Sequence, residues 1–182
     1  MKKKMAVLGV DDFKSKLRGG GARPNLFKAT INFPDYVNGD AELTSFLCES
    51  AQLPGSDLGT IIVPFRGRQL KMSGDRVFAE WAVSIINDTD FAVRNSIETW
   101  MNGMNAHSAN TGLSSPIQYE ADLRIEQLDR SGDKIKSYMF RGAFPSSLGP
   151  IDVAYSSTDE IERFTVAFQY QYFDSLDPAT TS

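Results

Sequence analysis

The stretch ERFTVAFQYQYFDS, residues 162–175, alternates between two kinds of side chain and predicts a long β-strand. In an extended strand, residues two apart share a face. One face carries the apolar residues that we expect in a core, namely Phe164, Val166, Phe168, Tyr170 and Tyr172. The opposite face is short and uncharged, with Thr165, Ala167, Gln169 and Gln171. Exposed strands of monomers usually carry charges that discourage edge pairing. The absence of charge on this face therefore indicates that it is not the ordinary solvent-exposed surface of a monomer.

The composition is that of one globular domain. The chain has 182 residues, 41% of them hydrophobic and 23% charged, which is close to the globular average. Its formal net charge of −4 argues against a dedicated DNA-binding protein. Its one cysteine, Cys48, cannot form an intrachain disulfide. The apolar run at residues 5–10 is too short for a signal peptide, and no run approaches a membrane span, so we expect a soluble chain without a membrane anchor.

Most of the remaining chain is predicted to be β-structure. Strand patterns separated by turn residues occupy 25–33, 59–65, 77–86, 119–128 and 134–144. The segment SGDR, 73–76, predicts a turn, whereas 42–53 fits either a strand or a short helix. Pro64 cannot donate a ladder hydrogen bond, so we expect it at a sheet edge or a bulge.

One helix is expected to begin after NDTD, residues 87–90, where Asp88 or Asp90 can cap free N–H groups. Apolar residues then recur at helical spacing and predict one buried stripe, formed by Val93, Ile97, Trp100, Met101 and Met104. We expect Trp100 from this helix to meet Trp81, from the strand at 77–86, in the core.

The sequence offers no combination of residues that predicts catalysis or a cofactor. His107 lies in a loop without visible partners, and Cys48 has no neighbouring base, so neither indicates nucleophilic or metal chemistry. The glycines at 19–21 lack the Gly-Lys-Ser/Thr of a phosphate-binding loop, and NDTD lacks the glycine and distal glutamate of a calcium loop. We therefore predict a protein that is not an enzyme and binds no metal or cofactor.

One basic segment stands out, FRGRQLK at 65–71, which is followed by Arg76. Positive charge interleaved with aromatic rings can contact phosphates, so a nucleic-acid-binding β-module is an alternative function. Because the whole chain is acidic, we favour a contact between protein subunits, made by the segment IIVPFRGRQLKMSGDR, 61–76. The residues predicted at this interface are Pro64, Phe65, Arg66, Arg68, Lys71, Asp75 and Arg76.

Several blocks of the sequence resemble the tail tube proteins of contractile-tailed bacteriophages. They are ARPNLF (22–27), CESAQLPG (48–55), SGDRVFAEWAV (73–83), INDTDF (86–91) and FPSSLGPIDVAYSSTDEIERFTVAFQYQYF (144–173). The resemblance extends from about residue 12 to 174 and leaves out MKKKMAVLGV (1–10). It implies a mainly β, sandwich- or barrel-like fold with one α-helix, which closes into a hexameric ring with a continuous inner β-barrel. Stacked rings would form a hollow tube inside the contractile sheath, the conduit for the genome.

The resemblance also implies partners and a location. The partners would be further copies of the chain, the tail sheath protein, and the baseplate, tape-measure and tail-terminator proteins. DNA would pass through the lumen without specific binding. The protein would belong to the virion tail, after assembly in the host cytoplasm. The tube proteins of type VI secretion systems and of bacteriocins provide the alternative role.

Within this scheme we expect a flexible N-terminal arm at residues 1–22, a tube domain at 23–174 and a C-terminal tail at 175–182. A bore that DNA slides through should not hold phosphates, because each cationic contact adds attraction. The uncharged face of the opening stretch suits such a wall, so Ala167, Gln169 and Gln171 are predicted to face the lumen.

Overall fold

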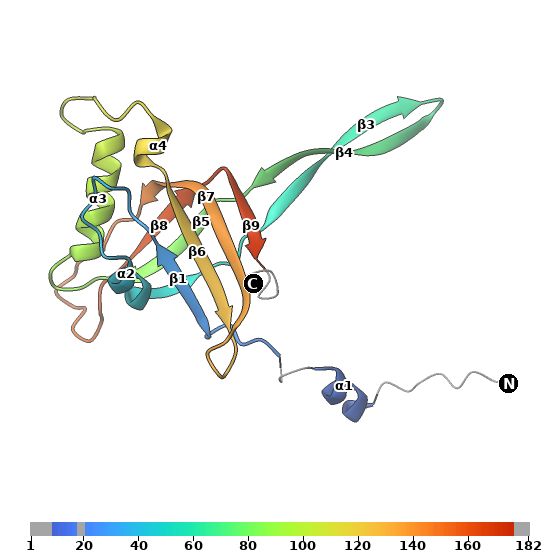
Figure 1. The fold of residues 1–182 in the computed structure, drawn as a ribbon, viewed down its shortest axis with the longest axis horizontal. Helices are drawn as coiled ribbons and strands as arrows, with labels where there is room; N and C mark the ends of the chain where they lie inside the picture. Colours follow the sequence, from blue (N-terminus) through green and yellow to red (C-terminus); the bar gives the residue numbers. More distant parts are fainter. Residues whose placement is uncertain (1–8, 18–20, 177–182) are drawn as a thin grey trace.

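The computed structural model describes residues 9–17 and 21–176, which form a β-sandwich body with a long projecting hairpin (Figure 1). The elements follow in the order α1 (Val10–Lys16), β1 (Phe27–Ile31), α2 (Ala41–Leu47), β2 (Cys48–Ala51), β3 (Ser56–Phe65), β4 (Arg68–Phe78), β5 (Trp81–Ile86), α3 (Ala92–Met104), α4 (Pro116–Tyr119), β6 (Ala121–Leu128), β7 (Lys134–Leu148), β8 (Arg163–Gln169) and β9 (Tyr172–Leu176). The mainly β fold confirms the sequence prediction.

Strand β7 joins two antiparallel sheets, because its 15 residues are enough to belong to both. Its first half pairs with β6 and β9, and β6 pairs with β1, which gives the β9 sheet, β1-β6-β7-β9. Its second half pairs with β8, followed by β5 and β2, which gives the β8 sheet, β7-β8-β5-β2. Gly142, with φ of 60°, lies at the register shift between the halves. A backbone with positive φ favours glycine, so this position suits the change of sheet.

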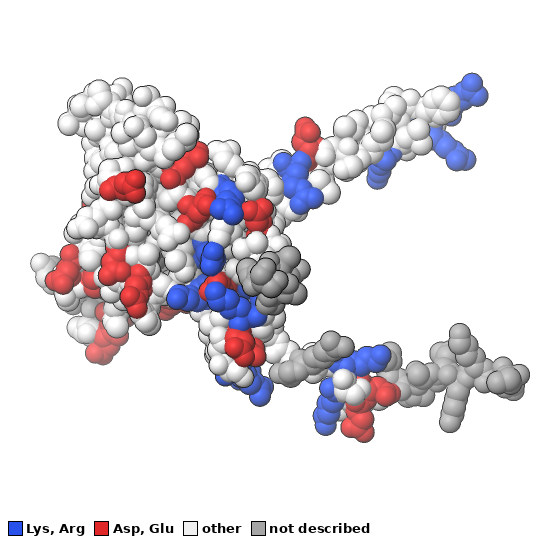
Figure 2. Space-filling view, viewed as in Figure 1, with Lys and Arg blue, Asp and Glu red and all other residues white. Residues whose placement is uncertain are grey.

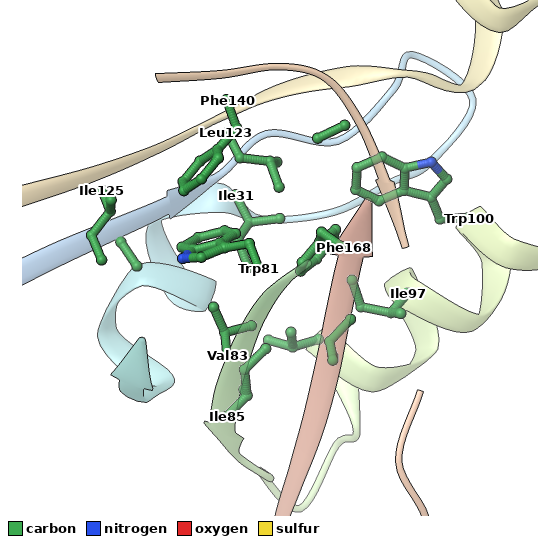
Figure 3. Close-up of a cluster of buried hydrophobic side chains, with 14 of the residues drawn as sticks. Ile31, Trp81, Val83, Ile85, Ile97, Trp100, Leu123, Ile125, Phe140 and Phe168 are labelled. Carbon is green, nitrogen blue, oxygen red and sulfur yellow. The ribbon is translucent and has the colours of Figure 1, made fainter. Parts of the chain in front are cut away.

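The core lies between the two sheets and α3 (Figure 3). Trp81 stacks on Phe140, with ring centroids 4.6 Å apart. The ring of Phe168 lies 5.8 Å from that of Trp81 and 6.0 Å from that of Trp100. Both tryptophans therefore lie in the core as expected, and Phe168 contacts each of them. Both indoles are also satisfied as donors, to the Gln52 carbonyl (2.8 Å) and the Tyr119 carbonyl (2.6 Å).

The opening stretch forms two strands instead of one. Phe164, Val166 and Phe168 are buried, as the alternation predicts, but β8 ends at Gln169. The chain then leaves the β8 sheet and pairs with the first half of β7, where the backbone amide of Gln171 donates a hydrogen bond to the Arg141 carbonyl (3.0 Å). Tyr172 begins β9 and is 49% exposed, so its predicted place in the core was wrong.

The expected helix is confirmed as α3, with Val93, Ile97 and Trp100 buried. The Asp88 carboxylate accepts from the Ala92 amide at 3.0 Å, one of the two predicted caps. The ambiguous segment at 42–53 contains both alternatives, since α2 leads directly into β2. The sequence missed the short helices α1 and α4, each of 7 residues or fewer.

The two chain ends differ in part from the expected arm and tail. Residues 1–8, 18–20 and 177–182 lie outside the described structure. The described part of the arm contains α1, which buries none of its side chains. At the other end, Ser175 and Leu176 continue β9. Among the helices that the structure describes, none is long and apolar enough to cross a membrane.

Candidate assembly interface

Strands β3 and β4 form a two-stranded sheet of their own that extends away from the body (Figure 1). Their antiparallel register runs from Ser56 opposite Phe78 to Phe65 opposite Arg68. The turn lies at Arg66 and Gly67, with φ of 47° and 80°. Two consecutive positive φ angles are characteristic of the type I′ turn that suits the twist of hairpins. Pro64 lies in β3, which pairs on one side only among the described residues, so its expected edge position is confirmed.

The turn predicted at residues 73–76 is wrong, because these residues lie within β4. The glycine there serves a close approach of the two strands. A Cβ atom on Gly74 would lie 3.1 Å from the carbonyl carbon of Gly59, next to a register shift in β3. This contact is tighter than ordinary van der Waals packing, so Gly74 meets a steric need and not a turn.

The hairpin exposes a continuous apolar face. All of β3 and most of β4 are exposed. Opposed residues share a face. The pairs Ile61–Met72 and Val63–Leu70, with Phe65 at the end, therefore lie together. Each of these five side chains is between 40% and 58% exposed. Two isolated strands are marginally stable in water, and large exposed apolar patches mark interaction sites. The hairpin therefore has the exposed apolar surface that is typical of an interaction site.

All charged residues in the outer part of the hairpin, residues 60–72, are basic. This part carries Arg66, Arg68 and Lys71 and no carboxylate, and Figure 2 shows this positive charge at the far end. The Arg66 guanidinium lies over the Phe65 ring, 5.4 Å from its centroid. The structure thus brings together five of the predicted interface residues, Pro64, Phe65, Arg66, Arg68 and Lys71. Asp75 and Arg76 lie nearer the base, where Arg76 donates to the Ser56 hydroxyl (3.1 Å).

Aromatic packing fixes the base of the hairpin to the body. Phe78, the last residue of β4, has its ring 5.9 Å from that of Tyr170 and 5.5 Å from that of Phe173. Tyr170 in turn contacts the buried Phe140 ring at 4.8 Å. The exposed arm is therefore continuous with the core.

The residues predicted to face the lumen are separated by the end of β8. Ala167 lies opposite Ala82 of β5 and Ser147 of β7, and is 8% exposed. Gln169 is exposed at the end of the same strand. Gln171 lies beyond it in a bend, where its side-chain amide donates a hydrogen bond to the Glu120 carboxylate (3.3 Å). Only two of the three residues thus share the face of β8.

The outward face of the β8 sheet is uncharged around Ala167. The pairing places small neutral side chains there: Ser50, Ala82, Ser84, Ser147 and Thr165. The neutral surface predicted from one strand therefore extends onto the neighbouring strands around Ala167, whereas an ion pair between Arg163 and Glu49 (2.7 Å) lies on the same face at the start of β8.

The outward face of the β9 sheet carries charge across its middle, in a network of ion pairs. Arg141 bonds the carboxylates of Asp122 and Asp174, and these hydrogen bonds raise its pKa above the ordinary value, with Asp174 the larger cause. Lys134 Nζ lies 2.6 Å from Glu126 Oε1. The two outer faces of the sandwich are therefore chemically distinct.

The described residues contain no group of three or more His, Cys, Asp or Glu side chains that could hold a metal ion. Burial raises the pKa of the Cys48 thiol to about 11, the opposite of what an activated nucleophile needs.

We expect Cys48 of the folded chain to react much more slowly with iodoacetamide at pH 8 than a free cysteine does. The thiolate is the reactive form, and a pKa of about 11 keeps the folded thiol protonated at this pH. Mass spectrometry over time measures the rate, and the urea-unfolded chain is the control. Equal rates in the folded and unfolded chains would contradict the prediction.

Comparisons with known proteins agree with this architecture. The sequence matches the model of the family described as phage tail tube protein over residues 22–175. It is 32% identical to the tail tube protein of Serratia phage KSP90, over 88% of this chain and 93% of that one. It is 26% identical to tail tube protein gp19 of Enterobacteria phage T4, over 91% of this chain and 99% of that one.

Two solved structures share the fold. One is a chain of the 6-fold symmetrised anti-feeding prophage baseplate, with a TM-score of 0.64, 11% identity, and coverage of 86% of this chain and 95% of that one. The other is a chain of the extended sheath-tube complex of the extracellular contractile injection system PVC, with a TM-score of 0.58, 13% identity, and coverage of 93% and 98%. The overall fold thus occurs in chains of contractile injection systems.

Proposed function

The chain belongs to the phage tail tube protein family, and we propose that six copies form a ring whose stacking builds the inner tube of a contractile tail. The 6-fold baseplate and the sheath-tube complex that contain similar folds support this assembly. The proposed partners are the sheath, baseplate, tape-measure and tail-terminator proteins. The tube acts as a conduit and not as an enzyme, in a virion tail assembled in the host cytoplasm. A tube of a related injection system is the alternative role.

Ring closure is supported by the open edges of both sheets. Strands β1 and β9 end one sheet, and β2 and the second half of β7 end the other, each paired on one side only among the described strands. Each sheet has four antiparallel strands, so its first and last strands run in opposite directions. The edge of one subunit can therefore continue the antiparallel ladder of the next, and a closed ring removes the edges. This arrangement provides the continuous inner β-barrel.

The observation that carries the proposal is the exposed hairpin. Burial of a large apolar side chain contributes about 1.5–3 kcal/mol. The apolar face of Ile61, Val63, Phe65, Leu70 and Met72 can therefore hold subunits together when it is covered. The predicted interface residues around Arg66 belong to this contact.

We assign the bore to the outward face of the β8 sheet, around Ala167 and Gln169. The support is the absence of charge on the small side chains opposite Ala167 on the neighbouring strands. A neutral wall lets DNA pass, whereas cations repeated around every ring would retain it. Gln171 is assigned to the same lumen on the sequence pattern alone.

The double variant Thr165→Lys/Gln169→Lys is expected to slow DNA ejection at low salt, and the ejection rate is expected to recover at high salt. Both residues are exposed, so the fold should tolerate the change. The attraction between the new lysines and the DNA phosphates weakens as the salt concentration rises. Thr30→Lys/Met139→Lys on the outward face of the β9 sheet is the matched control, and Gln171→Lys tests that residue separately. Ejection from well-formed particles, measured at both salt concentrations, distinguishes the faces. Normal ejection by the β8 variant with slow ejection by the control would place the bore on the β9 sheet.

Negative-stain microscopy and size-exclusion chromatography of the purified chain test the function itself. Rings or rods are the expected result. The second candidate is a nucleic-acid-binding β-module, favoured by the basic charge of the outer hairpin. A compact monomer that is retained on DNA would support that candidate and exclude the tube.

A further inference from the structure

The outer hairpin needs an acceptor, and the loop between β7 and β8 has the complementary charge. This acidic loop, residues 149–162, carries Asp152, Asp159, Glu160 and Glu162 and no Lys or Arg. Glu162 accepts a hydrogen bond from Asn87 (2.8 Å), whereas the other three carboxylates form no ion pair with any residue that the structure describes. The next residue, Arg163, is already paired with Glu49 at 2.7 Å. Three carboxylates of the loop are therefore free to meet cations.

The acidic loop also exposes apolar side chains. Val153 is 81% exposed, Tyr155 is fully exposed, and Ile161 is 63% exposed. Val153 and Ile161 line a hollow of about 370 Å³ together with Asp152, Glu160 and Glu162, and with Arg163, which is paired with Glu49. The loop thus presents apolar groups beside carboxylates, just as the outer hairpin presents apolar groups beside Arg66, Arg68 and Lys71. The two surfaces match in both charge and hydrophobicity.

The hairpin and the acidic loop lie at opposite ends of the subunit. In Figure 1 the hairpin extends from one end of the body, and the loop that connects β7 to β8 lies at the other. Figure 2 shows acidic side chains gathered at that end of the body. A hairpin therefore cannot reach the loop of its own chain, and the contact requires a second copy. Joining unlike surfaces of identical chains gives a head-to-tail contact, which can repeat without limit unless it closes.

We propose that the outer hairpin (60–72) of one subunit docks on the acidic loop (149–162) of a neighbouring copy. This inference rests on the proposed function and identifies the surface that receives the hairpin. Docking covers the face that contains Phe65 against Val153, Tyr155 and Ile161. It also places three cations against four carboxylates, which sets the orientation of the contact. Because part of the attraction is between surface charges, the contact weakens as salt increases.

Reciprocal charge reversal tests the proposal. Arg66→Glu/Arg68→Glu and Asp159→Arg/Glu160→Arg are each expected to remain folded and to lose sedimentable polymer. The quadruple variant, which exchanges the two charge sets, is expected to regain it. Asp35→Arg/Glu42→Arg makes the same charge change at exposed carboxylates elsewhere on the body and is expected to polymerise normally. Circular dichroism and urea midpoints confirm that each variant is folded.

The wild-type chain separates failure of this contact from failure of the proposed function. If the wild type forms no rings or rods, the tube function itself fails. If the wild type assembles and Asp159→Arg/Glu160→Arg also assembles, the acidic loop is not the acceptor. A quadruple variant that polymerises no better than the two double variants would likewise overturn the docking contact.

Discussion

A chain in which residues 58–76 are replaced by a short Asn-Gly turn is expected to fold normally and to remain unassembled. All of β3 is exposed, so its removal takes nothing from the core. Phe78, which packs on Tyr170 and Phe173, is kept and preserves the junction with the body. The truncated chain loses the whole apolar face through which subunits are proposed to meet. Analytical ultracentrifugation measures assembly, and circular dichroism measures folding.

The control for this truncation is Gln69→Asn, which shortens one side chain on the opposite face of the hairpin and leaves the apolar face intact. This variant is expected to form rods like the wild type. Rods formed by the truncated chain would show that the hairpin is not an assembly interface. An unfolded truncated chain would contradict the independence of the body from the hairpin.

The Trp100→Ala variant is expected to lose about 3–5 kcal/mol of unfolding free energy, the usual range for truncating a large buried aromatic. Trp100 is fully buried and contacts the rings of Phe33 and Phe168 at 5.7 Å and 6.0 Å. Its loss also leaves the Tyr119 carbonyl without its donor. Urea unfolding of the unassembled chain measures the change. Phe46→Ala is the control, because Phe46 is 79% exposed and its removal should have little effect. Stability close to that of the wild type would show that α3 is not part of the core.

Alternation in the sequence identified the core strands but not their ends. Phe164, Val166 and Phe168 are buried as predicted. The same pattern continues through Tyr170 and Tyr172, although the chain changes sheet between them. That change depends on pairing with the first half of β7, which is distant in sequence. Periodicity within one segment carries no information about a distant partner strand.

Local turn chemistry misled the prediction of the hairpin for a similar reason. Gly74 lies in a segment with turn-like composition, yet its role is set by the approach of Gly59 across the strand pair. The true turn includes Arg66 in a left-handed conformation, which the residue type alone does not indicate. The basic residues of the proposed interface could be singled out from the sequence, because charge is visible in composition. Ile61, Val63 and Met72 fall within the predicted contact segment but were not singled out, because strand residues of this kind are normally buried.

The acidic loop was also missed, although the sequence contains a signal for it. Residues 149–162 hold four carboxylates, no cation, and the apolar side chains Val153, Tyr155 and Ile161. The segment does not suggest a catalytic pair, and three of its four carboxylates form no ion pair with any residue that the structure describes. Comparing charged segments for complementarity between copies would have paired it with the outer hairpin.

The placement of the hairpin and the acidic loop at opposite ends gives any assembly of identically oriented subunits a polarity. In an open polymer built by the proposed docking contact, one terminus displays unoccupied hairpins and the other displays unoccupied acidic loops. A protein that nucleates growth at one terminus must therefore differ chemically from one that caps the other. An initiator that imitates the loop would accept hairpins and fix the direction of elongation, and a capping protein would need the reverse surface. The two roles therefore cannot be exchanged.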